Sequence, residues 1–116
     1  METNALGQPV GPEVPGWAGA KPPDGRVLEG RHVVLAPLEM GDAPALFEAY
    51  AEDESGADCT YLFSGPYGDV SSLQRVITGY LTGPDLFYCI CDTAGRAVGQ
   101  ASYLRIAPEA GSIEVG

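Results

Sequence analysis

The sequence predicts a mixed α/β or α+β fold: one strand and two helices, followed by an antiparallel meander of strands. Three observations support this prediction. Segments 42–50 and 69–81 repeat their apolar residues at helical spacing. Residues 86–91 form an apolar run rich in strand-forming residues. Glycine-containing turns then divide residues 92–116 into strand-length pieces, which indicates one mixed domain.

The first 29 residues have a composition that does not favour a hydrophobic core. Prolines and glycines interrupt the whole stretch; prolines lack a backbone donor, and glycines lose much entropy on ordering. We therefore expect residues 1–29 to be an extended or disordered arm and residues 30–116 to be the folded domain. Trp17 is the exception in the arm, and two outcomes are open for it: docking into a groove, or exposure to solvent.

The first half of the domain contains a strand and two helices with recognisable ends. Residues 32–37 are a short apolar run that ends at a proline, which predicts a strand. Asp42 is the candidate N-cap of the next helix, and Pro44 falls in its first turn, where a missing N–H is harmless. Asp69 opens the second helix, which is amphipathic, and residues 83–84 (Gly-Pro) end it.

The second half is predicted to be a meander. Residues 86–91 are apolar on both faces, which is typical of an interior strand. Gly95 supplies the positive φ of a hairpin turn to the partner strand 97–106, where Gly99 marks a bulge or a close backbone approach. Residues 112–116 begin a further strand in mid-pattern, so we expect the fold to be truncated in its fourth strand.

The net charge of −10 limits the classes of partner. Nucleic-acid surfaces need clustered Lys and Arg, whereas Lys21 is the single lysine here, so we expect no binding to nucleic acid or to anionic membranes. The acidity suits a cationic substrate or partner, or it serves only solubility. We find no signal-peptide pattern and no apolar run of about 18 residues, and we expect a cytoplasmic protein.

The small number of His and Cys residues excludes most known arrangements of catalytic side chains. His32 is the single histidine, and we interpret it as a structural residue at a strand edge. The spacing of Cys59, Cys89 and Cys91 matches no recurring zinc site, so we expect reduced thiols and no metal. The loop at 57–68 is unusually rich in aromatic residues, and it either packs over the core or lines a pocket.

The order and spacing of these elements resemble the N-terminal half of the GNAT N-acetyltransferases, in the branch that acetylates ribosomal proteins, protein N-termini and similar small amines. The resemblance covers about three quarters of the chain, from Leu28 to Gly116. The resemblance rests on six segments. In its first part these are residues 28–38 as a first strand and helices 42–50 and 69–81. In its second part they are strand 87–92, the string Gly-Arg-Ala-Val-Gly-Gln-Ala-Ser-Tyr at 95–103, and residues 112–116 as the start of the fourth, central strand.

This resemblance implies an enzyme that transfers acetyl from acetyl-CoA, as co-substrate, to a primary amine on a small molecule or peptide. It implies Glu114 as the base that removes the proton of the amine, with an ordinary outward-facing strand residue as the alternative. We expect Tyr61, Phe63 and Tyr67 to be walls of the acceptor pocket. The family's pyrophosphate loop would follow Gly116, so we expect no cofactor-binding residue in this chain and no activity from it alone.

A second interpretation is a non-enzymatic α/β module. Its open fourth strand would pair with another chain or with a second copy, giving a homodimer through the exposed edge strand. A small α/β domain without any ligand is the third interpretation.

Overall fold

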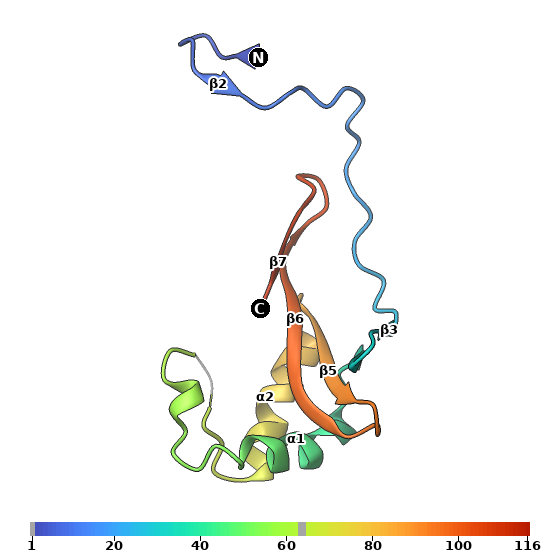
Figure 1. Ribbon diagram of the computed structural model, residues 1–116, viewed down its shortest axis with the longest axis vertical. Coiled ribbons are helices and arrows are strands. Elements are labelled where there is room, and N and C mark those ends of the chain that lie inside the picture. The colour runs from blue at the N-terminus through green and yellow to red at the C-terminus, as the bar shows by residue number, and fades with distance from the viewer. Residues whose placement is uncertain (1, 63–64) are drawn as a thin grey trace.

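The computed structural model describes residues 2–62 and 65–116, and it shows a folded unit with a long N-terminal arm (Figure 1). The molecule measures 56 Å along its longest axis and 29 Å along the other two. The hairpin formed by the last two strands projects from the folded unit on the side away from the helices (Figure 1). The mixed fold predicted from the sequence is confirmed.

One antiparallel sheet organises the folded unit. Its five strands lie in chain order, and each pairs with its sequence neighbour. The predicted interior strand is in the middle of the sheet, where Tyr88 on one face and Cys89 on the other are 3% and 1% exposed. The strands are β3 (Leu28–Glu29), β4 (Val33–Pro37), β5 (Leu86–Asp92), β6 (Ala97–Ala107) and β7 (Ser112–Val115).

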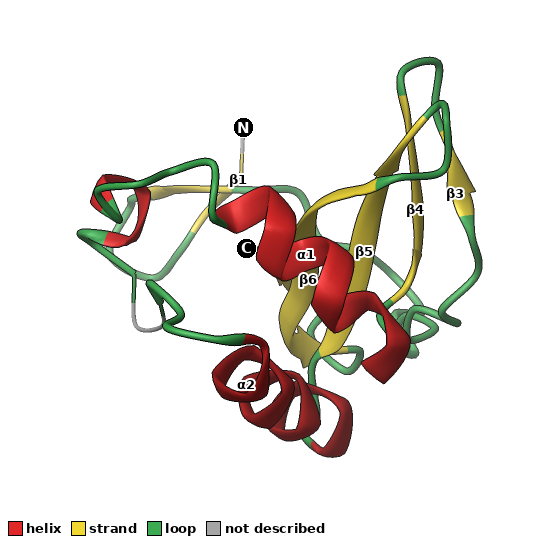
Figure 2. Ribbon diagram, turned by 90° about the horizontal axis from the view of Figure 1, so that it is seen from below, coloured by secondary structure: helices red, strands yellow, loops and turns green. Residues whose placement is uncertain are grey.

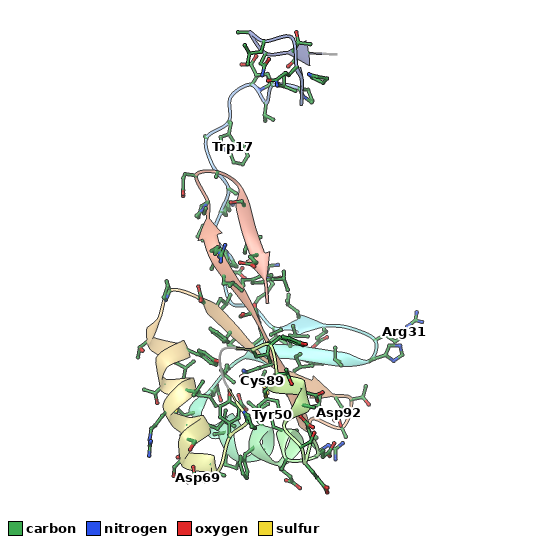
Figure 3. All side chains as sticks on the ribbon, turned by 90° about the vertical axis from the view of Figure 1, so that its left-hand side faces the viewer. Trp17, Arg31, Tyr50, Asp69, Cys89 and Asp92 are labelled. Carbon is green, nitrogen blue, oxygen red and sulfur yellow. The ribbon has the colours of Figure 1, made fainter. Side chains whose placement is uncertain are left out.

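Two helices cover the same face of this sheet, α1 (Ala43–Tyr50) and α2 (Val70–Thr82) (Figure 2). Both helix predictions are confirmed to within one residue at each end. Asp69 caps α2 as predicted, because its carboxylate accepts a hydrogen bond of 2.8 Å from the backbone N–H of Ser72 (Figure 3). Short 3-10 turns are present at η1 (Met40–Asp42) and η2 (Ala57–Cys59).

Asp42 stands at the predicted N-cap of α1, but it caps differently. Its side chain makes no cap hydrogen bond to α1. It accepts instead a hydrogen bond of 2.8 Å from the backbone N–H of Glu39, in front of the 3-10 turn. Pro44 lies in the first turn of α1, as predicted.

The core lies between the two helices and the sheet. Leu46 of α1, Leu73 and Ile77 of α2, and Cys89 of β5 are its largest fully buried side chains. Full burial of an aliphatic side chain of this size stabilises a fold by about 1.5–3 kcal/mol. These contacts hold α1 and α2 against the sheet, and the end of α1 therefore has a fixed position beside β5 and β6.

The predicted first strand over residues 28–38 is wrong in one respect, because the chain reverses within it. Leu28 and Glu29 pair with β4, so the sheet includes two residues that we had assigned to the arm. The backbone N–H of Gly30 donates to the carbonyl of Val33 at 2.9 Å, and a Cβ at Gly30 would lie 3.1 Å from that oxygen. The tight turn depends on this close approach, and it places His32 in an exposed bend rather than at a strand edge.

The arm is extended, and part of it contacts the sheet. It begins with a small hairpin of β1 (Glu2–Thr3) and β2 (Pro9–Val10). Further along, the hydroxyl of Tyr88 donates a hydrogen bond of 3.0 Å to the carbonyl of Arg26. The arm thus passes over the face of the sheet opposite to the helices.

Trp17 docks, but on a turn rather than in a groove. Its ring lies against Gly111 in the β6–β7 turn, far from the helices (Figure 3). About half of the side chain, 51%, stays exposed.

No helix within 2–62 and 65–116 has the length and apolar character that crossing a membrane requires.

Candidate functional site

A cleft of about 1100 Å³ opens on the helix-covered side of the sheet. The end of α1, the loop that follows it, and strands β5 and β6 form its walls. It combines an aromatic interior, two polar atoms in its walls, and an acidic rim. The residues that carry these properties are Tyr50, Tyr67, Phe87, Gln100, Glu52 and Glu54.

Aromatic rings form the interior of the cleft. Tyr50 at the end of α1 and Tyr67 in the loop lie with ring centroids 5.9 Å apart and planes tilted by 31°. Tyr80 of α2 stacks on Phe87 of β5 with centroids 3.9 Å apart and planes within 7°. The Tyr50–Tyr67 distance is typical of favourable aromatic pairs, and together the two pairs give the interior a largely apolar surface.

Two buried oxygens in the cleft walls have no partner. The hydroxyl of Tyr50 and Oε1 of Gln100 are inaccessible to solvent, and neither makes a hydrogen bond within the described part of the chain. A buried polar atom without a partner costs about 1–3 kcal/mol. Burial raises the pKa of the Tyr50 hydroxyl far above its usual range, and the neighbouring Tyr67 adds to the rise. Tyr50 is therefore a neutral hydroxyl that can donate or accept one bond.

The rim is acidic because the loop after α1 carries four carboxylates. Glu52, Asp53, Glu54 and Asp58 all line the cleft, and none of its described lining residues is Lys, Arg or His. Asp53 folds this loop: its carboxylate accepts hydrogen bonds from the backbone N–H of Asp58 at 3.0 Å and from the hydroxyl of Ser55 at 3.3 Å. The rim therefore attracts cations and repels anions.

The three residues predicted as acceptor-pocket walls have different positions. Tyr67 lines the cleft and is half-buried. Tyr61 is 97% exposed and is not among the residues that line this cleft, and its role as a pocket wall stays a prediction. Its loop turns the ring outward, whereas Leu62 contacts the cleft. Phe63 lies outside the described residues.

Sequence reasoning missed Tyr50 and Gln100. Tyr50 belongs to the segment 42–50 with apolar residues at helical spacing, and only the tertiary structure shows that its hydroxyl lacks a partner. Gln100 did leave a signal, because it is a polar residue between Gly99 and Ala101 on a strand that packs against helices. A polar side chain at such a position needs a partner.

Glu114 lies on β7, directly opposite Leu104 of β6. Directly opposed residues point to the same face of a sheet, and Leu104 lines the cleft, so Glu114 projects from the cleft side of β7, where it is exposed and is not itself among the residues that line the cleft. Its Oε2 forms an ion pair of 3.1 Å with Nε of Arg105. Arg105 has a φ of 49° where the β6–β7 register shifts, and this bulge directs the guanidinium toward Glu114.

The cysteines are all free thiols. Sγ of Cys89 and Sγ of Cys91 lie 3.9 Å apart. Burial, with Asp42 adding to it, raises the pKa of Cys89 to about 12, which leaves an unreactive thiol at neutral pH. Among residues 2–62 and 65–116, no three His, Cys, Asp or Glu side chains come together in a way that could hold a metal ion.

Solved structures of acetyltransferases match this fold. A probable acetyltransferase of the GNAT family from Chromobacterium violaceum is 26% identical, with a TM-score of 0.80, over 93% of this chain and 55% of that one. A GCN5-related N-acetyltransferase from Brucella melitensis is 27% identical, with a TM-score of 0.83, over 89% of this chain and 48% of that one. No protein-family model matches the chain, and no curated protein does.

The fold is therefore that of a GNAT-family acetyltransferase. The chain spans about half the length of the solved structures that it matches. The matches favour an acetyltransferase over a module that self-associates through its edge strand. The branch of the family suggested by the sequence stays a prediction.

Proposed function

We propose that this chain forms the amine-binding side of an N-acetyltransferase, which transfers an acetyl group from acetyl-CoA to a primary amine. The observation that carries the proposal is the acidic, aromatic cleft on a GNAT fold. A cleft with an apolar interior and a few polar groups is the usual form of a small-molecule site.

The cleft suits the amine rather than the phosphates of acetyl-CoA. CoA carries several negative charges, and protein sites for phosphates use basic side chains or the N–H groups at a helix N-terminus. The described lining of the cleft has no basic side chain, and its acidic loop follows the C-terminus of α1. We therefore propose that the phosphates are held by residues outside this chain.

The proposed reaction is a direct transfer. The nitrogen of the neutral amine attacks the thioester carbonyl carbon, and an N–C bond forms. The tetrahedral intermediate collapses, the C–S bond breaks, and the electron pair leaves with the CoA sulfur, which takes up a proton. The acetylated nitrogen loses one proton to a base.

We propose Glu114 as that base, because it projects from the cleft side of β7. The ion pair with Arg105 occupies its Oε2, so the proton would be accepted by Oε1 or after Arg105 moves. Exposed ion pairs are worth little, typically below about 1 kcal/mol, and such a movement costs correspondingly little.

A chimera tests this function. Residues 1–116 are joined to the complementary half of the Brucella melitensis protein, and thiol release from acetyl-CoA is followed with a panel of primary amines. We expect amine-dependent thiol release, and a fall of about 10²–10⁴-fold for Glu114→Gln. A chimera that is folded and binds acetyl-CoA, but transfers acetyl to no amine in the panel, contradicts the proposed function.

A further inference from the structure

We propose that the N-terminal arm is a latch: Trp17 fixes the direction of the outer part of the β6–β7 hairpin, residues 105–113, and thereby keeps Arg105 in the conformation that pairs it with Glu114. This contact between the arm and the hairpin is independent of the proposed function. Three features support it: the hairpin extends beyond the neighbouring strand, the arm holds its tip, and Arg105 lies between two fixed points.

The outer hairpin extends past the end of β5. The pairing of β5 with β6 stops at Leu86 and Tyr103, so residues 105–113 have no β5 residue beside them. On the other side of the hairpin, all four residues of β7 are exposed. An isolated two-stranded ribbon is at best marginally stable in water. The direction of the outer hairpin therefore depends on support from another part of the chain.

The arm supplies this support at the tip of the hairpin (Figure 3). Within the described part of the chain, the hydrogen bonds that join residues 105–113 to any element other than β6 and β7 come from Trp17 and Ala20. The ring of Trp17 also lies on Gly111, where a Cβ would be 2.7 Å from the ring, so only glycine leaves room for it. The tip is thus held by one fitted ring and two hydrogen bonds.

The packing between the outer hairpin and the rest of the molecule is loose. A hollow of about 500 Å³ lies between the arm, the loop before β5, and β6, with Pro22, Asp85 and Ile106 among its lining residues. Close-packed interiors resist movement, whereas a hollow leaves space for it. The outer hairpin therefore has room to change direction once Trp17 leaves Gly111.

Arg105 lies between two fixed points of β6. On one side Tyr103 pairs with β5, and on the other side the arm holds Pro108. Between these points the register of β6 and β7 shifts, and Arg105 has a φ of 49°. A residue with a Cβ is crowded in this region and stays there only where its surroundings impose it. Release of the tip removes one of the two constraints and lets Arg105 return to an ordinary φ.

The backbone of Arg105 determines where its guanidinium lies. In the latched hairpin, Nε of Arg105 is 3.1 Å from Oε2 of Glu114, and both side chains are largely exposed. Exposed ion pairs contribute little by themselves, so this pair depends on the backbone for its geometry. When the outer hairpin turns, the ion pair opens and the carboxylate of Glu114 is freed. The arm thus acts on Glu114 through the hairpin and Arg105.

Residual dipolar couplings of the backbone N–H groups test the latch directly in the 116-residue chain. In the wild type, residues 105–113 should share one orientation with β5. In Trp17→Ala we expect their couplings to fall to less than about half, while those of β5 stay unchanged, because motion about Arg105 averages them. Unchanged couplings of residues 105–113 would overturn the proposal. An equal fall in β5 would overturn it too, because it would show a general loss of structure.

Two further variants separate the latch from a mere loss of bulk in the arm. Gly111→Ala occupies the position of the ring without altering the arm, and we expect the same fall in couplings as in Trp17→Ala. Val14→Ala shortens an exposed side chain of the arm and should leave the couplings of the hairpin unchanged. A fall in Val14→Ala, or none in Gly111→Ala, contradicts the latch.

The Nε–H signal of Arg105 reports the ion pair. Glu114→Ala removes the partner and gives the position of this signal for a free guanidinium. We expect Trp17→Ala to move the signal at least about halfway to that position, because the pair opens when the hairpin turns. A signal that stays at its wild-type position while the couplings fall would overturn the link to Glu114. A chimera without acetyl transfer would overturn the proposed function and leave the latch unaffected.

Discussion

The indole N–H of Trp17 donates a hydrogen bond of 2.8 Å to the main-chain carbonyl of Glu109, 92 residues further along the chain. Next to it, the backbone N–H of Ala20 donates to the carbonyl of Pro108 at 2.8 Å. The proline-rich arm is thus attached to the β6–β7 turn by two hydrogen bonds and by one ring that lies against Gly111.

Gly111→Ala should release Trp17 from this turn. A Cβ at Gly111 would lie 2.7 Å from the ring, which is too close for the ring to stay. Because Trp17 is the single tryptophan, its fluorescence reports the contact. We expect emission to shift to longer wavelength and quenching by acrylamide to increase. Gly95→Ala is the control: it has a comparable positive φ of 83° but open space around the new Cβ, and should leave the emission unchanged.

Tyr50→Phe and Tyr88→Phe should shift stability in opposite directions. The hydroxyl of Tyr50 is buried without a partner, so its removal should raise the free energy of unfolding by up to about 1 kcal/mol. The hydroxyl of Tyr88 donates to Arg26, so its removal should cost about 1 kcal/mol. Thermal unfolding measures both. A clear loss of stability in Tyr50→Phe would show that its hydroxyl has a partner.

Cys89 should be the least reactive thiol. A pKa of about 12 in place of 9.0 leaves about 1,000-fold less thiolate at pH 8, and the side chain is 1% exposed. We expect iodoacetamide to label Cys89 last in the native chain and readily in urea, as read from peptide masses. Labelling of Cys89 at the rate seen in urea would mean that the core between helices and sheet is open.

Asp69→Ala should lower the melting temperature by a few degrees, because the N-terminus of α2 loses its cap. Hydrogen bonds from the side chain and then the backbone of Ser72 hold the pKa of Asp69 below its unfolded value of 3.8. A depressed pKa gives stability that is present above the unfolded pKa and is lost as pH falls through the folded one. The difference between wild type and variant should therefore be constant above about pH 5 and shrink in more acidic buffer, as melting curves across this range would show.

The sequence was sufficient where the determining signal is local. Both helices and the strands β5 and β6 follow from apolar spacing within a few residues, and Asp69 and Gly95 mark ends that short motifs define. The hairpin at residues 28–37 was not predicted, because its turn depends on the approach of Gly30 to Val33 rather than on a typical turn sequence.

The candidate site was harder to predict because it is built from distant parts of the chain. The aromatic content of the loop predicts both Tyr61 and Tyr67 as pocket walls, but only Tyr67 lines the cleft and Tyr61 is exposed, since composition does not tell which way a loop residue points. Tyr50 and Gln100 belong to α1 and β6, and only the packing of one on the other shows that their oxygens lack partners. Glu114 stays a prediction as the base.

Calorimetric titration with acetyl-CoA most directly tests the claim that this chain supplies the amine side of a GNAT acetyltransferase. The 116-residue chain should show no binding of acetyl-CoA tighter than a Kd of about 1 mM. The chimera with the complementary half of the Brucella melitensis protein should bind it with a micromolar Kd, and a Kd of about 1 μM corresponds to a binding free energy of about −8 kcal/mol. Micromolar binding by the chain alone, or none by a folded chimera, would contradict the account.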